Sequence, residues 1–229
     1  MSIHAIADLH LSFNTDKPMN IFGWIDYENK IEGDWKNKVK ENDLVLIPGD
    51  FSWEIKLENT YKDFSFINEL PGKKLLLKGN HDLWWTTLTN MRKFLEKNNF
   101  TNVDFIYNNS YEYKDKIIAG TRGWELEVET EQDKKIKDRE IFRLENSILD
   151  GIKKYGEDKE IIVCMHYPPI NKSCMENEFT RILKKYNVKK CVYGHLHGKA
   201  HENAVEGTVD GIEYKLVSCD YTNFKLIEL

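Results

Sequence analysis

The chain has 229 residues, of which 41% are hydrophobic and 31% are charged. This length and balance predict one globular domain covering 1–229. The formal net charge of −5 argues against an extended basic surface for nucleic acid. No apolar run approaches the roughly 20 residues that span a bilayer, so we expect no membrane partner.

The cysteines and the amino terminus indicate a cytoplasmic protein. The four cysteines form no C-x-x-C pair and match no zinc-finger spacing, which favours free thiols in a reducing compartment. The first candidate functional residue is Asp8, and the seven residues before it are too short for a secretory signal.

Short apolar runs along the chain each end abruptly in polar residues. They predict strands buried on both faces at 3–7, 44–47, 75–77, 117–119, 161–165 and 191–193. Between them, helical patterns cover 34–41, 57–70, 86–98, 131–155 and 175–186. Near the carboxyl terminus, a meander of strands is predicted at 207–209, 214–218 and 224–227. Strands that alternate with helices predict a layered α/β domain with a mixed sheet, whose strand-end loops gather on one edge.

Side chains with metal-binding chemistry follow these predicted strands. Five of the seven histidines lie there, together with two aspartates and one asparagine: His10, His81, His166, His195, His197, Asp8, Asp50 and Asn80. Imidazole, carboxylate and amide oxygen form a ligand set that suits manganese, iron, zinc or cobalt. Asp8 and His10 are two residues apart, as are His195 and His197, so an extended segment would turn each pair toward one cavity.

The number of these side chains favours two metal ions. They are too many for one tetrahedral zinc site, and they divide naturally if one carboxylate bridges two ions. Two metals roughly 3.5–4 Å apart are a known solution for phosphoryl transfer.

The order of the motifs resembles that of calcineurin-like metallophosphoesterases. The motifs are Asp8-x-His10, Gly49-Asp50, Gly79-Asn80-His81-Asp82, a lone His166 and Gly194-His195-x-His197. The surrounding sequence is similar to a bacterial group of small predicted phosphohydrolases, at Lys17-Pro18-Met19, at 47–50 and at 120–124. The resemblance implies a four-layer α/β/β/α sandwich of mixed sheets.

The resemblance also implies a role for each motif residue. Asp8, His10 and His197 would hold one metal, Asn80, His166 and His195 would hold the other, and Asp50 would bridge them. His81 would be the general acid or a phosphate contact, with Asp82 orienting its ring. The implied cofactor is a pair of divalent ions, with manganese favoured and iron, zinc, cobalt or nickel as alternatives.

Substrate recognition has two candidate features. Arg122 lies between Gly120 and Gly123, and could clamp a phosphate with its planar fork or form a salt bridge with a neighbouring acid. Aromatic residues lie beside the motifs and could stack on a nucleobase or aryl group, although packing is the favoured interpretation for most of them: Phe13, Trp24, Trp53, Trp84, Trp85, Trp124 and Tyr167.

These features predict a metal-dependent phosphohydrolase acting on a small phosphomonoester or phosphodiester. A metal-activated hydroxide would attack phosphorus while His81 protonates the leaving oxygen. The alternatives are a nuclease or cyclic-nucleotide phosphodiesterase, a mononuclear zinc hydrolase, and a non-catalytic scaffold with the same fold. The oligomeric state is not predicted.

Overall fold

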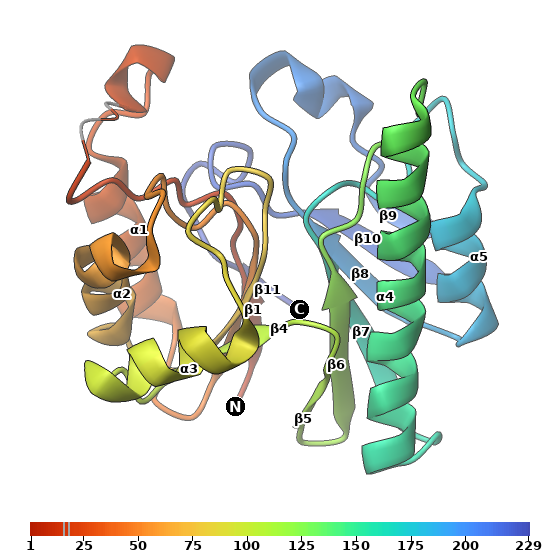
Figure 1. The fold of residues 1–229 in the computed structure, drawn as a ribbon, viewed down its shortest axis with the longest axis horizontal. Coiled ribbons are helices and arrows are strands. Elements are labelled where there is room, and N and C mark those ends of the chain that lie inside the picture. The colour runs from red at the N-terminus through yellow and green to blue at the C-terminus, as the bar shows by residue number, and fades with distance from the viewer. Residues whose placement is uncertain (16, 18) are drawn as a thin grey trace.

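Two mixed β-sheets pack face to face at the centre of the protein (Figure 1). The computed structural model describes residues 1–15, 17 and 19–229, so Pro18 of the Lys17-Pro18-Met19 motif lies outside the described residues. The first sheet has the strand order β11 (Ile227–Glu228), β1 (Ile3–Ala5), β2 (Leu44–Pro48), β3 (Lys73–Leu77) and β4 (Val103–Ile106). The second has the order β5 (Tyr111–Tyr113), β6 (Lys116–Thr121), β7 (Glu160–Met165), β8 (Lys190–Tyr193), β10 (Ile212–Leu216) and β9 (Gly207–Val209).

The strands at the centre of each sheet are parallel, with one antiparallel edge strand in the first sheet and two in the second. Strands β1 to β4 pair in parallel in the first sheet, and β6, β7, β8 and β10 do so in the second. The antiparallel partners are β11, β5 and β9. The carboxyl ends of the central strands therefore meet at one edge of each sheet, which is where open α/β sheets bind ligands.

Helices cover the outer face of each sheet (Figure 1). The first sheet carries α1 (Tyr27–Lys38), α2 (Tyr61–Asn68) and α3 (Leu88–Lys97), and the second carries α4 (Glu131–Tyr155) and α5 (Glu178–Lys185). Short 3-10 turns occur at η1 (Met19–Phe22), η2 (Leu57–Thr60) and η3 (Gly198–Asn203). The four-layer α/β/β/α sandwich is thus confirmed.

The space between the sheets is filled by aliphatic side chains. Leu46 and Leu75 from the first sheet meet Ile118, Ile162 and Val192 from the second in one buried cluster. Full burial of one such side chain is worth about 1.5–3 kcal/mol, so this layer fixes the two sheets against each other. The carboxyl edges of the two sheets are therefore held in a fixed position relative to each other.

Helix α4 follows directly from its sequence pattern. It covers 131–155 as predicted, and its amino end is capped by Thr130, whose side chain accepts from the Asp133 N–H. Leu144 and Ile148, four residues apart, are buried against the second sheet. Apolar residues at this spacing share one helical face, so the rest of the helix can carry charge.

Several elements differ from the sequence-based expectation. Helix α1 begins at Tyr27, seven residues earlier than predicted, and the segment 57–70 divides into η2 and α2. Strands β4 and β5 were not predicted. The carboxyl-terminal meander is also wrong, because β9 and β10 pair in the second sheet whereas β11 lies in the first. The chain crosses between the sheets near Ser218, which bridges to Ala7.

No helix among the described residues combines the length and the apolar character needed to cross a bilayer. The cytoplasmic location expected from the sequence stays a prediction.

Candidate metal centre

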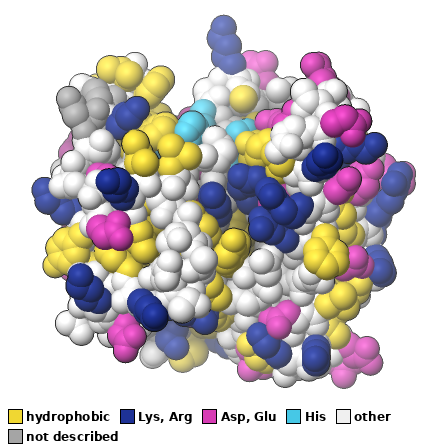
Figure 2. Space-filling model, viewed as in Figure 1, with side chains coloured by type: hydrophobic (Ala, Val, Ile, Leu, Met, Phe, Trp, Pro, Cys, Tyr) yellow, Lys and Arg dark blue, Asp and Glu magenta, His cyan; other side chains and the backbone are white. Residues whose placement is uncertain are grey.

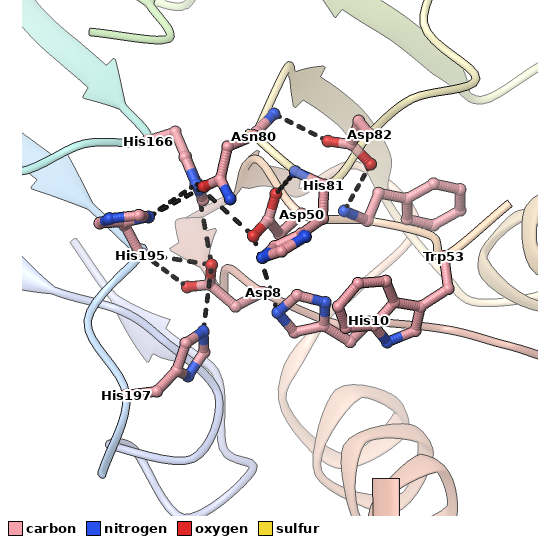
Figure 3. A network of polar contacts seen from close by, with 12 residues as sticks. Asp8, His10, Asp50, Trp53, Asn80, His81, Asp82, His166, His195 and His197 are labelled. Atoms are coloured by element: carbon pink, nitrogen blue, oxygen red, sulfur yellow. Dashed lines mark hydrogen bonds and ion pairs between the residues drawn. The ribbon is translucent and has the colours of Figure 1, made fainter. Parts of the chain in front are cut away.

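The predicted ligands converge where the carboxyl edges of the two sheets meet (Figure 3). The loops after β1, β2 and β3 supply Asp8, Asp50 and Asn80 from the first sheet. His10 follows Asp8 in the loop after β1. The loops after β7 and β8 supply His166, His195 and His197 from the second sheet. Neither sheet alone holds the whole set.

Two groups of side chains are close enough to hold a cation. Asp8, His10 and His197 offer ligand atoms within 4.8 Å of one another, and so do Asp8, Asp50 and His166. The first group is the set that the resemblance assigns to one metal. The second shares Asp8 with the first, so the two groups form one continuous cluster.

Asn80 and His195 complete the second group. The Asn80 Oδ1 lies 2.6 Å from His166 Nε2 and 2.9 Å from His195 Nδ1. The backbone N–H of His195 donates to both carboxylate oxygens of Asp8, at 3.1 and 3.0 Å. All seven predicted ligands are therefore brought together.

Asp50, a member of the second group, also lies next to His10 of the first group. Its Oδ2 is 3.7 Å from His10 Nε2 on one side and 3.6 Å from His166 Nε2 on the other. Its Oδ1 accepts from the His81 N–H at 2.8 Å. One carboxylate thus faces a histidine of each group, which is the placement that a bridging ligand needs.

The backbone at the ligands is turned rather than extended. Asp8, His10, Asp50 and His195 have φ of 60°, 45°, 51° and 74°, in the left-handed region that L-residues disfavour. The extended geometry expected for Asp8–His10 and for His195–His197 is therefore wrong, although the side chains still converge. Strain of about 1–3 kcal/mol per residue persists only where surrounding structure enforces it, as at functional sites.

Two glycine residues allow the ligand-bearing loops to approach one another closely. A Cβ at Gly79 would lie 2.0 Å from Asp50 Oδ1, and one at Gly194 would lie 2.5 Å from Asp8 Oδ2. Only glycine permits these contacts between neighbouring loops.

The pKa values of the two carboxylates are shifted in opposite directions. Burial acts to raise the pKa of Asp8, but the charge of His197, whose Nε2 lies 3.7 Å from Asp8 Oδ1, holds that pKa well below its usual range. Burial and the charge of Asp8 raise the pKa of Asp50 to about 7. Two buried carboxylates this close cannot both ionise without a counter-charge.

The pKa values of the clustered histidines are also shifted in different directions. Burial lowers the pKa of His10 to about 3 and that of His166 to about 4, so both rings are neutral and have free lone pairs at neutral pH. Burial also acts to lower the pKa of His197, but the hydrogen bond to Asp220 and the nearby charge of Asp8 raise it to about 10. A metal cation beside Asp8 and His197 would supply the positive charge that the proton on His197 supplies in its absence.

The cluster fits divalent cations by its chemistry. Asp8 and Asp50 are fully buried and face each other. Among the described residues, the ring nitrogens His10 Nδ1 and His197 Nε2 are buried without a hydrogen-bond partner. Buried charges and unpaired donors or acceptors are costly unless a metal or another group compensates them. Carboxylate and imidazole ligands suit first-row transition metals.

His81 stands at the exposed side of the cluster. Its ring lies 5.6 Å from that of His10 and 4.6 Å from that of Trp53, measured between centroids. Burial and the neighbouring histidines lower its pKa. The side chain is solvent-exposed, so a substrate can reach it.

Asp82 fixes the loops rather than the ring of His81. Its carboxylate accepts from the N–H groups of Phe51, Ser52 and Gly79 and from the indole of Trp84, at 2.9, 3.2, 2.7 and 2.9 Å. Within the described residues it makes no hydrogen bond to the His81 side chain. The role that these contacts support is to tie the loop of Asp50 to that of Asn80.

Asp220 is a site residue that the sequence analysis missed. Its Oδ1 lies 2.9 Å from His197 Nδ1, and its Oδ2 accepts from the Gly198 N–H at 3.2 Å. It orients the imidazole of His197, as carboxylates often do for metal-binding histidines. Its signal in the sequence was an aspartate just after an apolar strand, the same pattern that marked Asp8.

The aromatic side chains fall into two classes. Trp84 is buried in the core, as is most of Trp85, which confirms packing for both. Trp24 and Trp53 line a cavity of about 410 Å³ with His10, His81 and His197. Trp53 stacks on His10 with ring centroids 4.7 Å apart.

Arg122 lies beside the cluster rather than within it. Its guanidinium is 3.8 Å from the buried carboxylate of Glu140 and lies over the Trp124 ring, 4.6 Å from the centroid. Its carbonyl accepts from the N–H groups of His166 and Tyr167, at 3.2 and 2.9 Å. The backbone of Arg122 thus supports the loop of a predicted ligand while its side chain points to another set of partners.

Comparisons with known proteins agree with this architecture. The chain is similar to a phosphopantetheinyl hydrolase from Mycobacterium tuberculosis, with a TM-score of 0.57 and 12% identity over 100% of this chain and 95% of that one. It is also similar to a Thermus thermophilus protein, with a TM-score of 0.61 and 12% identity over 99% and 97% of the two chains. A protein of unknown function from Aquifex aeolicus matches with a TM-score of 0.52 and 18% identity over 99% and 95%. These likenesses show a shared fold.

No curated protein sequence matches the chain. The family model for calcineurin-like phosphoesterases matches residues 1–199, a span that holds the strand-end motifs from Asp8 to His197. The chain therefore belongs to the calcineurin-like phosphoesterase family.

Proposed function

We propose that this protein is a hydrolase that uses two divalent metal ions to cleave a phosphomonoester or a phosphodiester. The family supports a metal-dependent phosphoesterase in general terms. The observation that carries the two-metal proposal is the position of Asp50, whose Oδ2 lies 3.7 Å from His10 and 3.6 Å from His166.

Each ligand then has a role in the proposal. Asp8, His10 and His197 hold one ion, Asn80, His166 and His195 hold the other, and Asp50 contacts both. Divalent ions held by these residues would supply activation of a water molecule and would offset charge on the phosphoryl oxygens. Manganese is the ion we favour, and iron, zinc or cobalt also suit this set of carboxylate, imidazole and amide ligands.

His81 is the proposed general acid. It is exposed beside the cluster, and its backbone N–H is held by Asp50 at 2.8 Å. A neutral imidazole at this place can contact the phosphate, and a protonated one can donate a proton to the departing oxygen.

The cavity beside His81 favours an apolar leaving group. Trp24 and Trp53 form part of its wall, together with Met19 and Phe22. Aromatic and apolar walls bind rings and hydrocarbon well. An aryl ester is therefore a suitable first substrate for an assay.

One panel of substrates tests the proposal. Purified protein loaded with Mn²⁺ is assayed against p-nitrophenyl phosphate, bis(p-nitrophenyl) phosphate and cyclic nucleotides, and bound metal is counted by elemental analysis. We expect two ions per chain and turnover of at least one ester. Asp50→Asn should lose the second ion and the turnover, because the central carboxylate is gone.

The outcomes separate the alternatives. Turnover of the monoester alone would remove the phosphodiesterase and nuclease readings. One ion per active chain would favour a mononuclear hydrolase. Two bound ions with no turnover of any ester would contradict the proposed activity and leave a non-catalytic scaffold.

A further inference from the structure

A second cavity lies beside the metal centre, between the two sheets and helix α4. Its volume is about 380 Å³, within the range of small-ligand sites. Its walls come from the ends of β3, β4 and β6 and from the face of α4 that carries Arg139 and Arg143. The sequence singled out Arg122 from this region, as a phosphate clamp or a partner of a neighbouring acid, and the acid is Glu140.

The cavity is strongly cationic. Lys78, Arg122, Arg139 and Arg143 line it, and the one acid that the described residues contribute is Glu140, leaving a net charge of +3. The chain as a whole carries −5. Three of its five arginines line this one cavity. Three guanidinium groups therefore gather around one cavity of a chain that is acidic overall.

Glu140 organises the cluster without neutralising it. Its carboxylate is 1% exposed and lies 2.7, 3.6 and 3.8 Å from Arg143, Arg139 and Arg122. The Thr121 hydroxyl also donates to it at 2.7 Å. One carboxylate thus holds three arginines, each of which carries five N–H donors.

The guanidinium groups retain N–H donors that Glu140 does not use. The Nε of Arg122 is buried, and no described group accepts a hydrogen bond from it. Aromatic rings hold two of the groups in place, since Arg122 lies over Trp124 and Arg143 lies over Tyr107, 4.6 and 5.6 Å from the centroids.

The cavity adjoins the metal centre through the chain itself. Lys78 is two residues before Asn80, and the Arg122 carbonyl accepts from the His166 N–H at 3.2 Å. Figure 2 shows lysine and arginine side chains gathered in the hollow between the two halves, below the histidines on the same face. The cationic cavity and the metal centre are therefore neighbours on one face of the molecule.

We propose that this cavity, lined by Lys78, Arg122, Arg139 and Arg143, binds a phosphate group. A phosphate monoester carries a charge of about −1.5 to −2 at pH 7 and has three acceptor oxygens, which matches a cavity of net charge +3. Planar guanidinium forks bind such oxygens in pairs. The phosphate is either a second phosphate group of the substrate or free inorganic phosphate, and only the first assignment rests on the proposed function.

Binding of inorganic phosphate to the metal-loaded protein tests the cavity. Isothermal titration should show that Arg139→Gln/Arg143→Gln binds one phosphate fewer per chain than the wild type, or binds it at least about tenfold more weakly. Arg181→Gln is the matched control, since Arg181 lies on α5 and its contact is to the exposed Glu176. Equal number and affinity in the wild type and the double variant would overturn the proposal.

Two further variants guard against a folding defect. Arg139 is 52% exposed, so Arg139→Gln alone should leave the unfolding temperature unchanged and still weaken phosphate binding. Glu140→Gln should act in the opposite direction and tighten binding by at least about threefold, because it removes the one negative charge of the cavity. Weaker binding in a folded Glu140→Gln protein would contradict the electrostatic basis of the site.

Kinetics identify the source of the phosphate. If it belongs to the substrate, the double variant should lose at least about tenfold more kcat/KM toward adenosine 3′,5′-bisphosphate than toward p-nitrophenyl phosphate. If it is free phosphate, adding it should alter p-nitrophenyl phosphate turnover in the wild type and not in the double variant. Phosphate bound with neither effect would be an adventitious ion only and would overturn the functional assignment. Absence of all turnover would sink the proposed hydrolase, while the titration would still decide the cavity.

Discussion

At the scale of single residues, the exposed ring of His81 offers the clearest separation of binding from chemistry. It lies beside His10 but outside both groups of clustered ligand atoms. His81→Gln should therefore keep the full metal content and lower kcat by about 10² or more, the usual contribution of a general acid. Metal analysis and steady-state kinetics on the same preparation provide the measurement.

The leaving group supplies the control for this experiment. A p-nitrophenolate leaves easily and needs less protonation than an alkoxide, so the deficit of His81→Gln should be larger for an alkyl phosphate. Full activity of the variant with both esters would remove His81 from the mechanism.

Asp220 is the residue whose role was seen only in the structure. It holds the His197 ring at 2.9 Å and helps to raise the pKa of that ring to about 10. Asp220→Asn should weaken metal binding or activity by about 10- to 100-fold, the usual effect of losing such a partner. Metal titration monitored by calorimetry would show it. Asp210→Asn, in the β9–β10 turn, is the control and should bind metal like the wild type.

Residues that carry ligand chemistry were predictable because their types and their order in the chain are distinctive. Asp82 and Asp220 were harder, since an aspartate that accepts N–H groups looks in sequence like any other aspartate. Asp82 binds two loops that are about 30 residues apart in the chain, at 51–52 and at 79. Such a contact depends on strand order, which single-residue patterns do not contain.

At the scale of elements, the loops after β2 and β3 fit together only because Gly79 has no side chain. Gly79→Ala would place a Cβ 2.0 Å from Asp50 Oδ1 and 2.2 Å from Asp50 N, so the loops must separate. We expect loss of metal binding together with a lower unfolding temperature, measured by elemental analysis and thermal denaturation.

Gly33 is the matched control for that substitution. It lies within α1, and a Cβ there would meet nothing within 4 Å. Gly33→Ala should stabilise the protein by about 0.5–1 kcal/mol, because alanine loses less backbone freedom in a helix. Equal metal content in Gly79→Ala and Gly33→Ala would contradict the close fit of the loops.

The strong elements were predictable and the weak ones were not. Helix α4 shows a long apolar repeat and a capping threonine, and its bounds were predicted correctly. Helix α1 begins after Asp26, whose side chain makes no capping hydrogen bond, so its start has no clear signal. Strand β5 is short and only partly buried, and β11 has two residues. Elements of this size are determined by pairing with neighbours rather than by their own composition.

At the scale of the whole molecule, metal binding should be coupled to protons. In the metal-free protein the pKa of Asp50 is about 7 and that of His197 is about 10, so both groups carry protons at pH 6 and only His197 does at pH 8.5. Ligands must be deprotonated to bind metal. We expect release of nearly two protons per chain at pH 6 and about one at pH 8.5.

Calorimetry in buffers of different ionisation enthalpy measures this release. Metal affinity should rise with pH up to about 10, where His197 loses its proton. The same shift affects the metal-free fold: the raised pKa of His197 stabilises it fully below pH 6.5, and this stabilisation is lost as the pH rises through about 10. Proton release that does not change between pH 6 and pH 8.5 would contradict the assigned protonation states.

The division of the ligands between two sheets also matters during synthesis. Asp8 is made first. His197 follows nearly 190 residues after Asp8, and Asp220 follows more than 210 residues after it. A nascent chain that has made only β1 to β4 of the first sheet presents Asp8, His10, Asp50 and Asn80 without the three histidines that close the cluster. Tight metal capture must therefore wait for the second sheet to dock, and a bound metal marks a chain whose assembly is finished.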